Sequence, residues 1–163
     1  MHYFYWDASA LAKRFVAEPG SRIVNELLDK VPPVRMLALL IGIGEIVSIL
    51  VRRRNGGVIS SALYAEAVLQ LNAEIIQPPG FRLLPVEDDL VDGSLGLIER
   101  HSINATDAMI LASAIRVAEV LRGQKDELVL VAADDRLLRA AQLEGLKICN
   151  PEAMTLAGVN SLI

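Results

Sequence analysis

Short apolar runs alternate along the chain with longer stretches of helical periodicity. The short runs predict strands at His2–Trp6, Val34–Leu37, Arg82–Leu84, Leu128–Ala132 and Lys147–Cys149. The longer stretches predict helices near Ala8–Val16, Ser21–Lys30, Leu40–Arg54, Ser60–Ile75, Asp88–His101, Asp107–Arg122 and Arg136–Glu144. Strands and helices that alternate in this way are typical of a parallel sheet with helices on both faces. We therefore predict a three-layer α/β/α fold with a central, mainly parallel sheet.

Proline and glycine mark the loops between these elements. The clearest loops are at Pro32-Pro33, Asn55–Gly57, Pro78–Gly80 and Asn150-Pro151. None of them is long enough to separate two domains, and there is no internal repeat. The 163 residues, 53% of them hydrophobic, suffice for one substantial core. We predict a single domain over residues 1–163.

Cysteine content and hydropathy bear on the compartment. The only cysteine, Cys149, has no partner for an intramolecular disulfide, and no segment near the start has the order of a secretory signal. The apolar run Met36–Val51 precedes three arginines and superficially resembles a membrane anchor. It is shorter than the about 20 residues that a spanning helix needs, and Glu45 interrupts it. We expect a cytoplasmic protein that does not enter a membrane.

The net charge of -4 argues against a protein that grips nucleic acid through a broad basic face. It does not exclude a metal-dependent nuclease, because the acids of such a site are themselves negative and bound cations reverse the local field. Basic pairs and runs at Lys13-Arg14, Arg52–Arg54 and Arg136 with Arg139 are candidate phosphate contacts. Solvated helix faces explain any one of them more simply.

Four acids stand among apolar or small residues: Asp7, Glu45, Asp107 and Asp134. A buried lone carboxylate loses its charge, finds a partner or binds a metal. No Lys or Arg lies within three residues of Glu45 or Asp107. Asp7 and Asp134 each follow a predicted strand, at the edge of the sheet where ligands bind in open α/β folds. A divalent metal held by converging carboxylates, with hydrolysis at phosphorus, is the leading interpretation.

Each acid also has a simpler explanation. Asp7 and Asp134 could cap the helices that follow them, and Asp107 could complement the dipole of its helix. Glu45 lies in the middle of a helix and could point outward or pair with a distant arginine. One shared cause accounts for all four more simply than four separate ones.

Nearby side chains refine the expected chemistry. Ser9 and Thr106 stand close in sequence to Asp7 and Asp107 and could hydrogen-bond the metal ligands, although helix capping explains Thr106 more simply. His2 and His101 are isolated, which disfavours zinc. Ligation by oxygen alone points to Mg²⁺, with Mn²⁺ as a substitute. In the doublet Asp134-Asp135 we assign the ligand role to Asp134 and capping or solvent contact to Asp135.

At these residues the sequence resembles the PIN-domain family, in particular the VapC-type toxin ribonucleases of toxin–antitoxin pairs. The similar segments are YFYWDASALAKRFVAEPGS, EIVSILVRR, TDAMILASAI and AADDRLLRAAQLEGL. The resemblance implies a PIN-like α/β/α fold, Mg²⁺-dependent cleavage of RNA, a homodimer and an antitoxin partner. It also implies that Asp7, Glu45, Asp107 and Asp134 are the catalytic metal ligands. One departure is Ala132, where the family commonly has Ser or Thr two residues before the fourth acid.

Other functions stay open on the sequence alone. A PIN-type nuclease could process RNA outside a toxin system. A phosphatase of the haloacid dehalogenase type would need a second Asp where Ser9 stands. A metal-binding or protein-binding module would share the core without turnover. The apolar helices Leu40–Arg54 and Ser60–Ile75 could line a groove for an antitoxin segment or a second subunit, or simply pack in the core.

Overall fold

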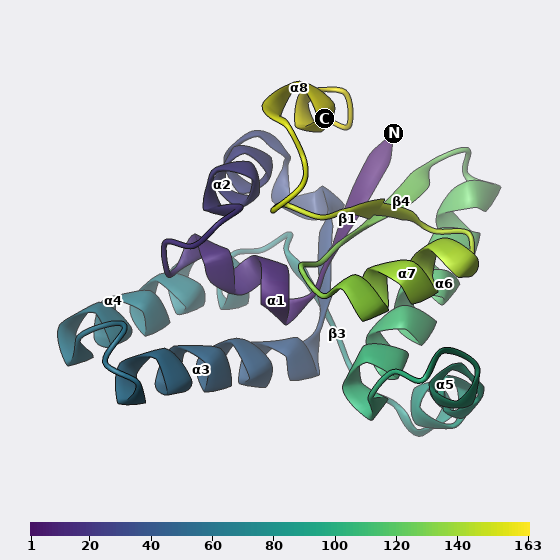
Figure 1. Cartoon of the computed structure of the whole chain (residues 1–163). Coiled ribbons are helices and arrows are strands. Elements are labelled where there is room, and N and C mark those ends of the chain that lie inside the picture. Colours follow the sequence, from purple (N-terminus) through teal and green to yellow (C-terminus); the bar gives the residue numbers. More distant parts are fainter.

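The centre of the molecule, a computed structural model that describes residues 1–163, is a five-stranded sheet (Figure 1). Its strands are β1 (His2–Trp6), β2 (Met36–Leu39), β3 (Arg82–Leu84), β4 (Glu127–Val131) and β5 (Lys147–Cys149). They pair in the order β3-β2-β1-β4-β5, and every pairing is parallel. The predicted α/β/α fold with a parallel sheet is confirmed.

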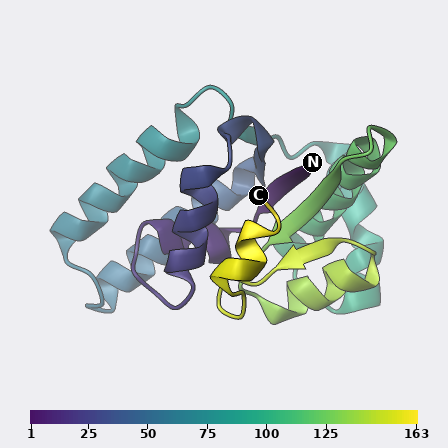
Figure 2. The same ribbon diagram turned by 90° about the horizontal axis from the view of Figure 1, so that it is seen from above.

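Helices cover both faces of this sheet. One layer contains α1 (Ala8–Leu11), α2 (Ser21–Lys30), α3 (Leu40–Asn55), α4 (Ser61–Leu71) and α8 (Leu156–Asn160). The other contains α5 (Asp88–His101), α6 (Ala105–Gly123) and α7 (Asp135–Leu143). Both views place α8 beside α2, so the last helix lies against the first layer (Figures 1 and 2).

Two hydrophobic cores follow from the alternation of side chains along the buried strands. Phe4 and Trp6 of β1 join the core under α1, α2, α3 and α4, whereas Tyr5 joins the core under α5, α6 and α7. β4 divides in the same way, with Val129 and Val131 on one side. Because both faces are covered, these strands read as continuous apolar runs and not as alternating ones.

The direction of the strand order reverses at β1. The chain steps outward from β1 to β2 and β3, then returns across the sheet to add β4 on the other side of β1. Trp6 is the register partner of Val131, and the Asp7 amide donates to the Val131 carbonyl at 2.9 Å. The carboxyl ends of β1 and β4 therefore lie side by side, which is where open α/β sheets bind ligands.

The second strand lies later than predicted. The segment Val34–Leu37 was expected to be extended, but Pro33–Arg35 forms a 3-10 turn and the strand begins at Met36. The Arg35 guanidinium is buried and donates to the carbonyl of His2, which fixes this turn against the start of β1. A turn after two prolines therefore displaces the strand toward the chain's C-terminus.

Several helices also differ from the sequence-based prediction. The segment Ala8–Val16 splits into α1 and a 3-10 turn at Ala12–Arg14, and Ser60–Ile75 becomes α4 followed by a π-helical turn at Asn72–Ile76. The short helix α8 was not predicted. None of the helices combines the length and the apolar character that crossing a membrane requires.

Candidate active site

One cavity of about 180 Å³ is lined by all four of the acids that the sequence analysis selected. Asp7 comes from the end of β1, Glu45 from α3, Asp107 from the first turn of α6 and Asp134 from the residue before α7. Ser9, Ile49 and Arg52 contribute to the same wall. The fold thus brings carboxylates that are far apart in sequence to one point at the carboxyl edge of the sheet.

Asp7 is the most deeply buried of the four, with 5% of its surface exposed. It is the N-cap of α1, and its Oδ2 accepts a hydrogen bond from the Ser9 amide at 2.9 Å. Burial raises the pKa of its carboxyl, and hydrogen bonds from Ser9 and Ala8 oppose that effect. Capping explains why an acid follows β1, but not why it is buried beside three further acids.

Ser9 connects the two central strands at the site. Its hydroxyl donates to Asp7 Oδ2 and accepts a hydrogen bond from the Ala133 amide at 2.9 Å. Ala133 belongs to the loop after β4, so one side chain holds the segments after β1 and β4 together. Ser9 therefore contacts an acid of the site, as expected. Ala132 has no hydroxyl where the family commonly has Ser or Thr. The amide of the next residue, Ala133, is hydrogen-bonded to the Ser9 hydroxyl.

Glu45 is half-buried in α3, next to Ile46, which packs in the core. Burial and the nearby charge of Asp7 raise the pKa of Glu45, whereas Arg52 lowers it. Arg52 lies seven residues later, two turns along α3, so both side chains reach the same cavity. From the sequence, Arg52 was noted only as part of a basic run, and its spacing of seven residues from Glu45 was the available signal for this juxtaposition.

Asp107 is half-buried in the first turn of α6, and its pKa is raised to about 7. Burial is the main cause, followed by the charges of Asp7, Asp134 and Glu45. A carboxyl with this pKa carries a proton part of the time at neutral pH. The charges of these three acids contribute to the shift because all four side chains line one cavity.

Asn104 supports Asp107 and was not selected from the sequence. Its Oδ1 accepts from the Asp107 amide at 2.9 Å, and its Nδ2 donates to Asp107 Oδ2 at 2.8 Å. Asn104 is thus the N-cap of α6, and the capping role expected for Thr106 is wrong. Thr106 does not line the cavity. An Asn three residues before a selected acid was the available signal.

Asp134 is exposed and combines two roles in one carboxyl group. Its Oδ1 accepts from the amides of Arg136 and Leu137 at 2.8 and 3.1 Å, which makes it the N-cap of α7. It also lines the acidic cavity, whereas Asp135 does not. Of the two roles expected for Asp135, capping is wrong, because Asp135 is already the first helical residue. Contact with solvent is confirmed, since Asp135 is exposed, and its Oδ1 accepts from Asn150 at 3.4 Å.

The donors at this cavity fit a hard divalent cation. Four carboxylates and one hydroxyl offer only oxygen atoms, and none of the four acids forms an ion pair. As placed, no three of them form a finished metal cluster. Unpaired carboxylates about 4 Å apart would repel by about 4 kcal/mol at an effective dielectric near 20, so their closer approach would need a cation.

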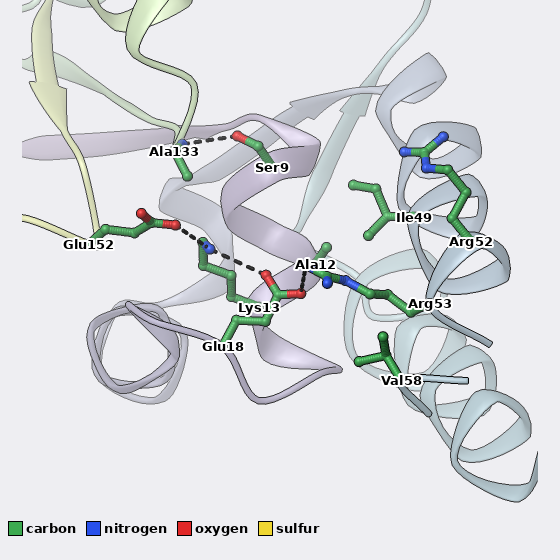
Figure 3. Close-up of a pocket in the computed structure, with 10 residues that line it drawn as sticks. All are labelled: Ser9, Ala12, Lys13, Glu18, Ile49, Arg52, Arg53, Val58, Ala133 and Glu152. Atoms are coloured by element: carbon green, nitrogen blue, oxygen red, sulfur yellow. Dashed lines mark hydrogen bonds and ion pairs between the residues drawn. The ribbon is translucent and has the colours of Figure 1, made fainter. Parts of the chain in front are cut away.

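A second cavity of about 480 Å³ continues from the acidic one and shares Ser9, Ile49 and Arg52 with it. Figure 3 shows the buried Lys13 between Glu18 and Glu152 in its wall, with Nζ to Oε distances of 3.4 and 2.7 Å. Glu18 also pairs with Arg53 of α3. This network ties the segment after α1 to α3 and to the loop after β5.

Comparisons with known proteins identify the family and agree with the fold. A family model described as the PIN domain matches residues 4–143. Among solved structures, the chain is similar to the crystal structure of FitAcB from Neisseria gonorrhoeae, with a TM-score of 0.62 and 18% sequence identity. That alignment covers 93% of this chain and 99% of the other, and the likeness concerns the fold. No curated protein matches the sequence.

Proposed function

The chain belongs to the PIN domain family, whose members are generally nucleases, and on that premise we propose that it is a Mg²⁺-dependent endoribonuclease. Mn²⁺ is the expected substitute for Mg²⁺. The proposed ligands are Asp7, Glu45, Asp107 and Asp134, with Ser9 orienting the Asp7 carboxylate. Thr106 lies outside the cavity and has no role in this proposal.

One observation carries the proposal. Four carboxylates from four separate elements line a single small cavity at the carboxyl edge of the sheet, and none has an ion-pair partner. Such a set is unfavourable without a cation, because the charges of Asp7, Asp134 and Glu45 raise the pKa of Asp107. A stable protein retains it for a function that needs the charges.

The residues of the site divide the work of phosphodiester hydrolysis. A bound Mg²⁺ supplies Lewis acidity toward the scissile phosphate and a lowered pKa for an attacking water. Asp7 provides a fixed, buried oxygen donor because Ser9 and the start of α1 hold its carboxylate. The pKa of Asp107 is about 7 without metal, and a bound cation would lower it, so that Asp107 would hold the metal as an ionised carboxylate. Arg52, exposed at the rim, offers a positive charge to the incoming phosphate.

The test is cleavage of a single-stranded RNA by the purified protein with Mg²⁺, with Mn²⁺ and with excess chelator. Asp7→Asn and Asp107→Asn each remove a ligand charge and preserve shape, and we expect either to reduce cleavage by roughly a hundredfold or more. Asp135→Asn is the matched control, because it removes a charge from the same helix start outside the cavity. Undiminished cleavage in chelator would refute the proposal.

We further propose that the protein is the toxin of a toxin–antitoxin pair and acts in the cytoplasm as a homodimer. The support is the resemblance of its motifs to VapC-type ribonucleases and the apolar side chains that α3 and α4 leave on the surface. Leu40, Leu63 and Leu69 are all more than half exposed, and exposed apolar side chains on these helices support the proposal of a protein partner there. Light scattering tests the dimer. Co-purification with the product of the neighbouring gene, and loss of cleavage when it is added, tests the antitoxin.

A further inference from the structure

A third cavity, of about 430 Å³, lies between the end of α5 and the outer face of α7. Its seven lining residues include Arg100, His101, Arg136 and Arg139, and none of the seven is acidic. The volume falls within the ~300–1,000 Å³ that small-ligand sites occupy. In a chain with a net charge of -4, such a concentration of basic side chains calls for a specific cause.

Ion pairs within the protein do not explain why basic side chains gather at this cavity. Glu144 Oε1 pairs with Arg100 Nη1 and with His101 Nε2, each at 2.6 Å, and so anchors one wall of the cavity. Arg136 and Arg139 have exposed side chains and form no ion pair and no side-chain hydrogen bond. The nearest acid along the helix, Asp135, contacts Asn150 instead. Glu144 therefore pairs with one guanidinium and one imidazole of the cavity, and the guanidinium groups of Arg136 and Arg139 stay without an acidic partner.

The position of Arg136 also argues against a role in stability. It is the second residue of α7, at the positive end of the helix dipole, where a cation is unfavourable. Arg139 lies three residues later on the same face and adds a like charge. Helix starts favour acids, so these arginines weaken the isolated helix and are consistent with a role in binding an anion.

Chain continuity places this basic cavity next to the acidic one. Arg136 follows Asp134 by two residues, and its amide donates to the Asp134 carboxylate at 2.8 Å. On the other wall, His101 and Ser102 lead directly to Asn104, which holds Asp107. The two cavities share no residue, but each receives side chains from the same two stretches of chain, residues 101–107 and 134–139.

We propose that this basic cavity is a phosphate subsite that binds the RNA backbone beside the scissile phosphodiester. The inference rests on the proposed ribonuclease function. It adds the path of the RNA backbone, which would run from the acidic cavity across the start of α7. Arginine suits this role because its guanidinium binds phosphate oxygens through two parallel hydrogen bonds. Glu144 keeps Arg100 and His101 in place while leaving Arg136 and Arg139 free for the ligand.

The experiment measures equilibrium binding of a fluorescein-labelled single-stranded RNA to the full-length protein in excess chelator, across a salt series. We expect Arg136→Gln and Arg139→Gln each to raise Kd by about tenfold at low salt. Each should lower the slope of log K against log salt by about 0.7, the share of one phosphate contact on a single strand. Arg22→Gln is the matched control, because Arg22 is exposed and unpaired on α2, away from both cavities.

Glu144→Gln should change the Kd for RNA in the opposite direction from the arginine variants. Glutamine keeps an acceptor oxygen for Arg100 and His101 but removes the negative charge, so this variant should bind RNA more tightly. Thermal unfolding of each variant checks that the fold is intact. Unchanged Kd and salt slope in both arginine variants, or an Arg22→Gln effect of equal size, would overturn the subsite. Displacement of the RNA by a polyglutamate peptide at equal charge concentration would overturn it too, since it would identify an acidic protein segment as the occupant.

Binding in chelator and cleavage in Mg²⁺ are separate readouts. If the wild type fails to cleave RNA while binding still depends on Arg136 and Arg139, the proposed function fails and the subsite stands. If the wild type cleaves RNA and both arginine variants match it in KM and Kd, the function stands and the subsite fails.

Discussion

The Ser9 hydroxyl joins Asp7 to Ala133, donating to the Asp7 carboxylate and accepting from the Ala133 amide at 2.9 Å. This one side chain links the segments that leave β1 and β4, the two strands at which the sheet order reverses. Ser9 therefore positions the most deeply buried acid of the site and also holds together the two segments that follow β1 and β4.

Replacing Ser9 with Ala should lower both stability and cleavage. The change leaves the Ala133 amide without its partner and Asp7 without one donor, so we expect a loss of about 1–2 kcal/mol in the free energy of unfolding. Cleavage should fall by roughly 10- to 100-fold, as for other groups that orient metal ligands. Denaturant unfolding and cleavage rate measure the two effects. Ser48→Ala is the control, because that hydroxyl contacts only the Gly44 carbonyl within α3.

Asp7→Asn should separate stability from activity. Burial raises the pKa of Asp7, so its ionised form is unfavourable in the folded protein. Without metal at neutral pH, the neutral amide should increase the free energy of unfolding by on the order of 1 kcal/mol while cleavage is lost. Denaturant unfolding of both proteins in chelator is the measurement. A marked loss of stability would mean that the charge of Asp7 is satisfied within the protein.

Stability without metal should fall as pH rises from about 4 to about 7. The pKa of Asp107 is 3.8 in a model compound and about 7 in the folded protein, so in this interval the folded state holds a proton that the unfolded state has released. The free energy of unfolding therefore decreases with pH through this window and then levels off. Asp107→Asn should flatten the profile, and Mg²⁺ affinity of the wild type should increase with pH through about 7. A wild-type profile that already lacks this decrease would contradict the proximity of the acids.

Asp134 and Asp135 should give opposite results. Asparagine caps a helix as well as aspartate does, so Asp134→Asn should leave stability nearly unchanged and reduce cleavage by roughly a hundredfold or more. Asp134→Ala should cost about 1 kcal/mol in addition, because α7 then loses its cap. Asp135→Asn should change neither quantity. Mg²⁺ titration and cleavage rate, measured side by side, decide between them; a dead Asp135→Asn variant would reassign the ligand.

Asn104→Ala should affect the site as well as its helix. It removes the cap of α6 and the hydrogen bond to Asp107 Oδ2, so we expect a cost of about 1 kcal/mol and a 10- to 100-fold weaker Mg²⁺ affinity. Ser60→Ala removes the cap of α4, where Ser60 accepts from the Leu63 amide, and should match the stability loss alone. Equal Mg²⁺ affinity in the two variants would show that Asn104 acts only as a cap.

The periodicity of the sequence was enough to determine the layers of the fold. The predicted bounds are confirmed for three strands and two helices: β1, β3, β5, α2 and α5. Apolar runs and amphipathic stretches indicate which residues are buried, and so where such elements begin and end. The predicted boundaries of β2 and α4 are wrong because a local turn interrupts the hydrophobic pattern at each of them. The two prolines before Val34 form a 3-10 turn that displaces β2, and the end of α4 passes into a π-helical turn at Asn72.

The sequence also singled out the acids, since a carboxylate among apolar residues is unusual wherever the chain folds. Their approach to one another was decided by tertiary structure. Only the placement of β4 beside β1 brings Asp134 to Asp7, and only the packing of α3 and α6 on opposite faces brings in Glu45 and Asp107. Three contributions to the site depend on the direction and distance between side chains, which the order of residues does not specify. They are the support that Asn104 gives to Asp107, the approach of Arg52 to the cavity, and the contact of Ser9 with Ala133.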